Sequence, residues 1–440
     1  MLAATGSAVG LGNIWKFPYI TGQNGGGAFV LVYLVCILII GIPVMMGELL
    51  IGRRGRQSPS HSIAELAKEA GAPRAWSFIG FMGITASFLI LTFYVVVAGW
   101  AVAYIFATAS GAFAGADADA VGAYFGDFQA NPWELILWST VVTLGTAAIV
   151  AGGVRKGLER AVTWLMPGML IILVLLVGYA LNTGSFMEGF RFLFQPDFGK
   201  LSANGVLVAL GHAFFTLSLA SGVMIAYGAY LPEDTSIFQT SVIVAASDTA
   251  VALLAGLAIF PIVFAYGLDV GGGPGLIFAT LPIAFGQMPF GQFFGTLFFI
   301  MLSLAAITSA ISLLEPTVAW VVERFGTTRR RAVIITSVIL WLLSLGTVFS
   351  FSTPSKATFF GRTFYDNLDY LTANIMLPAG GLLVAVFTAW IMKPESTRHE
   401  LQLGESRIYS TWGFVMRYIA PIAILIVFLN AIGVLKFGGD

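Results

Sequence analysis

The sequence predicts an all-α membrane protein with a single transmembrane domain over residues 1–440. Of its 440 residues, 58% are hydrophobic and 10% are charged, and the mean hydropathy is +0.89. A soluble domain is typically about one quarter charged. Apolar runs of about 20 residues, long enough to cross about 30 Å of hydrocarbon as a helix, recur along the chain. These observations exclude a water-soluble fold.

Eleven membrane spans are expected from these runs. They cover residues 1–22, 28–52, 75–107, 132–150, 157–182, 203–230, 239–266, 291–324, 331–350, 369–392 and 413–435. The odd number places the two termini on opposite sides of the membrane. The opening MLAATGSAVGLGNIW lacks the basic segment of a signal peptide, and only five residues precede Gly6. We therefore expect no cleavable signal peptide, and the short start suggests either an N-terminal truncation or a misplaced start.

Basic residues concentrate in alternate connections, those after the second, fourth, eighth and tenth spans. They are Arg53, Arg54, Arg56, Lys68, Arg74, Arg155, Lys156, Arg160, Arg329, Arg330, Arg331, Lys393, Arg398 and Arg407. Because Lys and Arg favour the cytoplasmic side, these connections are expected inside the cell. The N-terminus is then cytoplasmic and the C-terminus is outside.

The composition also limits the function. A formal net charge of zero gives no reason to expect nucleic acid as a partner. The single Cys36 and the three histidines form no metal-ligand pattern. No Ser/His/Asp or Cys/His constellation indicates an enzyme. The expected partners are membrane lipid and a small solute.

The first and sixth spans are expected to be broken at mid-membrane depth. Gly6, Gly10 and Gly12 fall within seven residues of the first span, and FTLSLASG occupies residues 215–222 of the sixth. Glycine is a poor helix former, and unwound backbone in a membrane must line a cavity enclosed by protein. Paired breaks in two halves of a chain point to a transporter site. The alternative is that these glycines only allow close helix packing.

Motifs along the whole chain carry a family resemblance. They are GSAVGLGNIWKFPY from Gly6, NGGGAF from Asn24, GIPVMMGE from Gly41, FYVVVAGW from Phe93, GGVRKG from Gly152, FFTLS from Phe214, GPGLIF from Gly273 and the pair Thr308-Ser309. In these motifs the chain resembles the neurotransmitter:sodium symporter family, which has the LeuT fold. The resemblance implies a 5+5 inverted repeat, about 1–182 and 203–392, with discontinuous first and sixth helices and an extra C-terminal helix at about 413–435.

The resemblance also implies an activity. The chain would be a sodium-coupled symporter that imports an amino acid by alternating access across the bacterial inner membrane, with one copy sufficient for transport. A broken helix offers carbonyl oxygens suited to sodium. By resemblance, one sodium ion would be held by Ala8, Asn13, Thr216 and Asp248, and a second by Gly6, Val9, Ala305, Thr308 and Ser309. Hydrogen bonds within or between helices are the alternative role for Thr308 and Ser309.

Asp248 is a carboxylate deep in an apolar span, where a cation partner is expected. The family usually has Asn at this position. Its chloride-dependent members hold the anion with a serine, a tyrosine, a glutamine and a threonine, and this chain has Ala252, Tyr33, His212 and Thr216 at those places. Asp248 is therefore expected to supply the negative charge itself, without chloride. His212 is interpreted as a hydrogen-bonded neutral ring, with proton dependence as the alternative.

The same resemblance implies a substrate site. Amides near Leu11 and Gly12 and the Tyr94 hydroxyl would hold a carboxylate. Carbonyls of Ala8, Phe215 and Thr216 and the Ser218 hydroxyl would hold an ammonium. The side-chain pocket would consist of Ile90, Phe215, Ser221, Ser309 and Leu313. Gly10 and Leu11 favour an α-amino acid, and an apolar one is the hypothesis.

Gating residues follow from the same comparison. Lys16 and Asp369 resemble an outer gate pair, with Tyr94 and Phe215 as an aromatic lid below. Glu323 matches the acidic half of an inner gate. Glu48 is expected to accept hydrogen bonds from amides freed at the breaks. Two other functions stay open, a proton-coupled amino-acid transporter and a sodium-dependent substrate sensor that does not transport.

Overall fold

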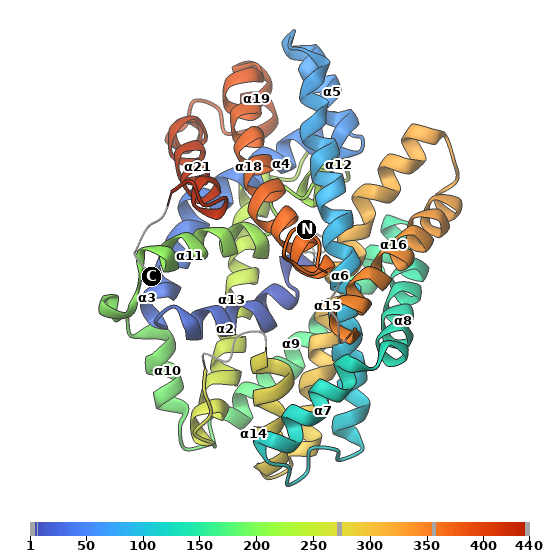
Figure 1. Ribbon diagram of the computed structural model, residues 1–440. Helices are drawn as coiled ribbons and strands as arrows, with labels where there is room; N and C mark the ends of the chain where they lie inside the picture. The colour runs from blue at the N-terminus through green and yellow to red at the C-terminus, as the bar shows by residue number, and fades with distance from the viewer. Residues whose placement is uncertain (1–4, 7, 271–274, 354–357, 436–440) are drawn as a thin grey trace.

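The protein is a bundle of long helices in the computed structural model (Figure 1). The structure describes residues 5–6, 8–270, 275–353 and 358–435. Within these ranges, nine helices are long and apolar enough to cross a membrane. They run over Gly27–Gly55, Arg74–Ala109, Pro132–Ala151, Gly157–Ala180, Ile237–Ala265, Gly291–Phe325, Arg329–Ser352, Phe364–Ile391 and Arg407–Ala431. Residues 1–4 of the first predicted span, and Gly273 of the GPGLIF motif, lie outside the described ranges.

Most of the α-helical segments that make up these nine helices are labelled in Figure 1. The α-helical segments are α3 (Gly27–Cys36), α4 (Ile42–Gly55), α6 (Phe78–Ala109), α8 (Pro132–Ala151), α9 (Arg160–Ala180), α13 (Ile237–Ala265), α15 (Gly291–Phe325), α16 (Arg329–Ser352), α17 (Phe364–Asp369), α18 (Leu377–Val386), α20 (Arg407–Phe414) and α21 (Ala420–Ala431). Wider π-helical turns join several of them, at η2 (Ile37–Gly41), η4 (Val154–Glu159), η7 (Tyr370–Met376), η8 (Phe387–Ile391) and η9 (Val415–Ile419).

Each of the nine helices overlaps one predicted span, but the tenth and eleventh spans were predicted to start too late. Their helices begin at Phe364 and Arg407. Both first turns are polar and are fixed by caps. Thr363 forms a capping box with Asp366, and the Ser406 side chain accepts from the backbone N–H of Tyr409. Hydropathy does not detect such turns. The number of membrane crossings stays a prediction.

The sixth predicted span is broken. It consists of α11 (Ala203–Thr216) and α12 (Val223–Ala229), with six non-helical residues, 217–222, between them. Ser218, Ala220 and Gly222 have φ values of 54°, 62° and 74°. The left-handed region costs an L-residue about 1–2 kcal/mol, so the surrounding contacts must hold Ser218 and Ala220 in place. The predicted interruption is therefore real.

The first predicted span is broken as well. Val9 and Gly10 form a bend, and regular structure resumes at Leu11, through η1 (Gly12–Lys16) into α2 (Phe17–Gln23). The Gly10 N–H donates to Asn13 Oδ1 at 2.8 Å. Both η1 and α2 pack against α13, and α11 packs against α3 (Figure 1). The two breaks therefore lie inside the bundle.

Five shorter helices were not predicted. They are α5 (Pro59–Ala70), α7 (Ala118–Ala130), α10 (Phe186–Phe194), α14 (Leu281–Gln287) and α19 (Pro394–Leu401). On one side of the bundle, arginines of the last turn of α4 hold two of them. Arg53 is 2% exposed and pairs with Glu400 of α19, and Arg54 donates to both Glu69 oxygens of α5 at 3.0 and 2.6 Å. The Arg54 guanidinium holds the pKa of Glu69 below its ordinary value.

Glycines allow α4 and α12 to lie in direct backbone contact. A Cβ added to Gly52 would lie 1.9 Å from the Ile225 carbonyl oxygen, and one added to Gly228 would lie 2.5 Å from the Leu49 carbonyl oxygen. These distances are far below van der Waals contact, so neither position accepts a side chain without moving a helix. Close approach of α12 to α4 fixes the second half of the broken span.

We predict that Gly52→Ala destabilises the protein by about 2 kcal/mol or more, because the methyl group overlaps a carbonyl that cannot move freely. Gly178→Ala is the matched control, since a Cβ there meets open space. This second change in a helix should be neutral or stabilising by up to about 1 kcal/mol. Thermal unfolding in detergent checks both, and equal midpoints for the two variants would contradict the packing argument.

Candidate functional site

A buried carboxylate lies beside both broken helices. Asp248 of α13 is 0% exposed. Its Oδ1 accepts from Asn13 Nδ2 at 2.7 Å, and the Thr216 hydroxyl lies 3.0 and 3.1 Å from the two carboxylate oxygens. Tyr33 donates to Oδ2 at 3.4 Å. Every partner described for this carboxylate is a neutral donor, so its negative charge is stabilised but not paired.

Asn13 ties this cluster to the first break. Its Nδ2 also lies 2.9 Å from the Asp248 backbone carbonyl oxygen and 3.2 Å from Thr216 Oγ1, while its Oδ1 accepts from the Gly10 N–H. The amide, the carboxylate and the hydroxyl come from η1, α13 and α11. Their oxygens are the hard ligands that alkali cations prefer. The structure brings Asn13, Thr216 and Asp248 together, and Ala8 is buried directly before the bend of Val9 and Gly10.

A second group of oxygens lies on the other side of the first break. The Val9 carbonyl oxygen is 3.5 Å from the hydroxyls of both Thr308 and Ser309 on α15. Thr308 also donates within its own helix to Ala305 at 2.9 Å. Gly6 packs close to α9, because a Cβ there would lie 2.4 Å from Val162. Both the bridging and the intrahelical interpretation of the hydroxyls are therefore compatible with these distances, and ion binding stays a prediction.

A small cavity of about 40 Å³ lies between the two breaks. All residues predicted to contact substrate line it, namely Ala8, Leu11, Gly12, Ile90, Tyr94, Phe215, Thr216, Ser218, Ser221, Ser309 and Leu313. Gly10, Leu219, Val223, Ser312 and Leu377 line it too and were not predicted. Their role as substrate contacts stays a prediction. The motif pointed to the first group, whereas the second could be found only from the packing.

The small residue at Gly10 is required by this cavity. A Cβ there would lie 2.0 Å from Ser309 Oγ and 3.4 Å from the Tyr94 hydroxyl. The Leu11 N–H, freed by the break, points to that hydroxyl at 3.4 Å. An acidic side chain at position 10 would therefore displace both hydroxyls. Bare amides and a phenolic hydroxyl are what a carboxylate ligand needs.

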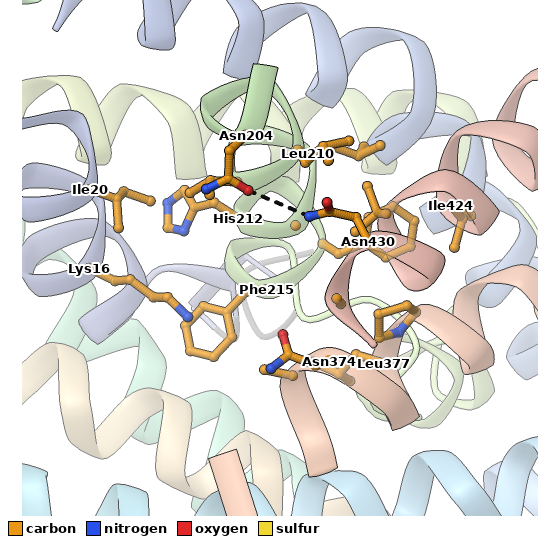
Figure 2. A pocket seen from close by; sticks show the side chains of 18 residues that line it. Lys16, Ile20, Asn204, Leu210, His212, Phe215, Asn374, Leu377, Ile424 and Asn430 are labelled. Atoms are coloured by element: carbon orange, nitrogen blue, oxygen red, sulfur yellow. Dashed lines mark hydrogen bonds between the residues drawn. The ribbon is translucent and has the colours of Figure 1, made fainter. Parts of the chain in front are cut away.

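A larger cavity of about 270 Å³ lies next to the small one and shares Phe215 and Leu377 with it (Figure 2). Here the expected gate pair is not made. Lys16 Nζ lies 4.0 Å from the centre of the Phe215 ring, and the described residues show no ion pair between Lys16 and Asp369. In this structure the Lys16 ammonium makes a cation–π contact with Phe215. The role of Lys16 and Asp369 as an outer gate stays a prediction.

His212 also differs from its interpretation. It is 2% exposed, and neither ring nitrogen has a hydrogen-bond partner among the described residues. Its neighbours are aromatic rings, with centroids 6.0 Å away for Phe17, 5.3 Å for Tyr33 and 6.5 Å for Phe215. The expected hydrogen bond is therefore not made to any residue that the structure describes; aromatic rings surround the imidazole there.

At the opposite end, Glu323 has a partner that was not foreseen. Its carboxylate accepts from the Ser58 N–H at 2.8 Å and lies 2.7 Å from His61 Nδ1. His61 belongs to α5, one of the short helices that hydropathy missed. Sequence alone could only align Glu323 with an acidic gate position, because this contact joins residues 262 positions apart.

Glu48 supports the second break as expected. It is 0% exposed in α4, and its Oε1 accepts from the Ala220 N–H at 2.6 Å. That amide belongs to the non-helical segment between α11 and α12 and has no place in a helical ladder. The prediction that Glu48 binds a freed amide is confirmed.

The broken helices, the buried oxygens and the enclosed cavity define a solute carrier of the membrane. The sequence model of the Sodium:neurotransmitter symporter family matches residues 1–120 and 116–437. The chain belongs to this family; it is a multi-span membrane transporter and not an enzyme, as predicted.

Individual relatives agree in sequence and in fold. The uncharacterized sodium-dependent transporter YhdH of Bacillus subtilis is 39% identical over 99% of this chain and 97% of its own length. An uncharacterized sodium-dependent transporter of Haemophilus influenzae is 32% identical, covering 98% and 96%. The crystal structure of MhsT in complex with L-phenylalanine superposes with a TM-score of 0.90 at 44% identity, covering 98% of this chain and 97% of that one. The all-helical LeuT-type fold is thus shared with MhsT.

We predict that Glu48→Leu destabilises the protein by about 1–3 kcal/mol, because the buried Ala220 N–H loses its acceptor. Glu48→Gln keeps an acceptor oxygen of similar reach and should retain most of the stability. The thermal midpoint in detergent is the measurement. If the leucine and glutamine variants lost equal stability, the hydrogen bond to Ala220 would not be the reason that Glu48 stabilises the protein.

Proposed function

We propose that the chain is a sodium-coupled secondary active symporter that imports an apolar α-amino acid by alternating access. The observation that carries the proposal is the convergence of Asn13, Thr216 and Asp248 from a broken first span, a broken sixth span and α13. The two bacterial relatives are named as sodium-dependent transporters, which supports sodium as the coupling ion.

The uncompensated charge of Asp248 favours a cation at this point. A buried carboxylate that accepts only from neutral donors is costly in a membrane interior unless a cation completes it. We place the first sodium ion among Ala8, Asn13, Thr216 and Asp248. We place a second at the other group of oxygens, among Gly6, Val9, Ala305, Thr308 and Ser309. A monovalent, oxygen-bound ion suits both groups.

The small cavity next to Asp248 suits an amino acid. Leu11 and Gly12 amides with Tyr94 would hold its carboxylate, and Ser218 with nearby carbonyls would hold its ammonium. Ile90, Leu313 and the Phe215 ring offer an apolar wall. The L-phenylalanine in the MhsT complex supports an apolar side chain.

Chloride independence follows from the neighbours of Asp248. The hydroxyls of Tyr33 and Thr216, which could donate to an anion, already donate to this carboxylate. Ala252 is fully buried and offers no donor. A second anion beside Asp248 would be repelled by its charge. The proposal therefore assigns no site to chloride.

The surrounding architecture is proposed to follow the family. It comprises two inverted repeats, about 1–182 and 203–392, with an extra helix at about 413–435. The basic loops would face the cytoplasm from the bacterial inner membrane, and one copy would suffice for transport. Lys16 and Asp369 would act as the outer gate in another state, and Glu323 with His61 would close the inner side.

We predict that a sodium gradient at equal pH on both sides drives amino-acid accumulation in proteoliposomes, and that replacing chloride with gluconate leaves the rate unchanged. Asp248→Asn should weaken the apparent sodium affinity about tenfold or more, because the fixed negative charge is lost. Tracer uptake as a function of sodium concentration is the measurement.

Asp119→Asn is the matched control, since it removes the same charge from the exposed surface of α7. If a proton gradient drove accumulation and a sodium gradient did not, the chain would be a proton-coupled transporter and the proposed sodium coupling would be wrong. Substrate binding without counterflow would identify a sensor in place of a transporter.

We further predict that Ser221→Leu shifts preference from large to small apolar amino acids. Ser221 is 2% exposed and lines the cavity, so a larger side chain takes space from the substrate. Affinity for phenylalanine should fall about tenfold or more, while affinity for alanine should change little. Ser221→Ala controls for loss of the hydroxyl alone. Equal weakening for both amino acids in a competition panel would contradict this assignment.

A further inference from the structure

A second, polar cavity lies away from the transport site, where the tenth-span helix meets the C-terminal one. Its volume is about 460 Å³. It opens between η8, α19, α20 and η9, and its charged and hydroxyl-bearing walls include Thr397, Arg398, Glu405, Tyr409, Ser410 and Arg417. No residue of this cavity lines either cavity near the helix breaks. The transport cycle therefore gives no reason for its polarity.

Arg417 is the unusual residue of this cavity. It lies in η9, within a helix whose apolar stretch qualifies as a membrane span, and it is exposed. Its Nε donates to the Ala389 carbonyl oxygen at 3.0 Å, and no carboxylate pairs with it in the described part of the chain. The other guanidinium N–H groups remain available. An arginine in a membrane helix is costly and normally has an anionic partner.

The second arginine leaves the cavity with a net positive charge. Arg398 lies 3.3 Å from Glu405 and 5.3 Å from the centre of the Tyr409 ring. Two arginines and one glutamate line the cavity, which gives 2 − 1 = +1. Glu405 has an 86% exposed side chain and is committed to Arg398, so it does not neutralise Arg417. The cavity is therefore built to attract an anion.

Exposed aromatic rings place this cavity at the membrane boundary. Trp390, Phe414 and Tyr418 are 58%, 56% and 47% exposed. The Tyr418 ring lies 6.0 Å from that of Trp390 and 5.4 Å from that of Phe414. The Trp390 indole N–H donates to the Arg417 carbonyl oxygen at 3.4 Å. Clustered exposed Trp and Tyr are typical of the headgroup region of a bilayer.

We propose that this cavity binds the phosphate headgroup of an anionic phospholipid. Arg417 would hold the phosphate oxygens through paired N–H donors, with Arg398 adding charge and Ser410 a hydroxyl. The acyl chains would lie along the exposed rings of Trp390, Phe414 and Tyr418. Basic pockets between membrane helices are known to take such headgroups. A zwitterionic lipid fits less well, because its cationic group would meet two arginines.

The test uses the delipidated full chain in detergent. Phosphatidylglycerol, phosphatidylcholine or inorganic phosphate is added, and native mass spectrometry counts bound lipid while the thermal midpoint is followed. We expect phosphatidylglycerol to bind and raise the midpoint, with phosphatidylcholine at least about tenfold weaker and inorganic phosphate without effect. Arg417→Gln should weaken phosphatidylglycerol binding about tenfold or more.

Arg331→Gln is the matched control, because it removes one exposed arginine from the first turn of another membrane helix, α16. Ser410→Phe fills the cavity while leaving every charge in place, and should also block the lipid if Arg417→Gln fails to fold. Equal binding by the Arg417 and Arg331 variants, or equal binding of the two lipids, overturns the proposal. If inorganic phosphate alone gave the full rise in thermal midpoint, the cavity would bind a free anion and the lipid proposal would be wrong.

Discussion

Peptide groups freed from a helix inside a membrane have no water to bind, and each unpaired one costs several kcal/mol. Two membrane helices of this protein are opened, so the rest of the bundle must supply partners for the freed groups. Glu48 reaches from α4 to the Ala220 amide, and Asn13 folds back to the Gly10 amide. Ser221 donates to the Ser218 carbonyl oxygen at 2.6 Å. These buried polar side chains therefore serve, in the first place, as hydrogen-bond partners for backbone groups freed at the breaks.

Three fully buried carboxylates, Glu315, Glu48 and Asp248, differ in the partners that stabilise their negative charge. Glu315 is 0% exposed and pairs with Arg329, which also donates to the Val150 carbonyl oxygen. Its charge is permanently neutralised by a residue of the chain. Glu48 is committed to a backbone amide. Asp248 alone among these three has neutral donors on both oxygens, and its partner Asn13 also accepts from the Gly10 N–H at the first break. This difference is why the proposed function places the cation at Asp248.

How much the sequence predicts depends on the kind of interaction. Long apolar helices follow from hydropathy, and the broken spans follow from glycines such as Gly10 and from the family resemblance. Site residues far apart in sequence, such as Asn13 and Asp248, could be grouped only because the motif is shared. Short helices such as α5 are polar, so hydropathy gave no signal for them. Their contacts, including His61 with Glu323, were consequently out of reach.

Side-chain partners were the least predictable feature. Lys16 has two available neighbours, a carboxylate and an aromatic ring, and sequence spacing does not decide between them. His212 was expected to find an acceptor because buried polar groups usually do. Its position among Phe17, Tyr33 and Phe215 depends on the crossing of three helices, which no local pattern encodes. The course of the backbone is therefore more readily inferred than the conformations of the side chains on it.

Residues next to the two breaks border both the proposed ion oxygens and the proposed substrate cavity, and this would give coupling a physical basis. Thr216 donates to Asp248 with its hydroxyl and lines the cavity beside Phe215. Ala8, directly before the bend of the first span, lines that cavity too. A ligand that fixes either residue lowers the ordering cost for the other ligand, and thermodynamic linkage makes the effect equal in both directions. Two continuous helices would offer no such shared residues, since their carbonyls would already be bonded within the helix. Under the proposed function, the strained turn at Ser218 and Ala220 is the local cost of placing ion and substrate on one piece of backbone.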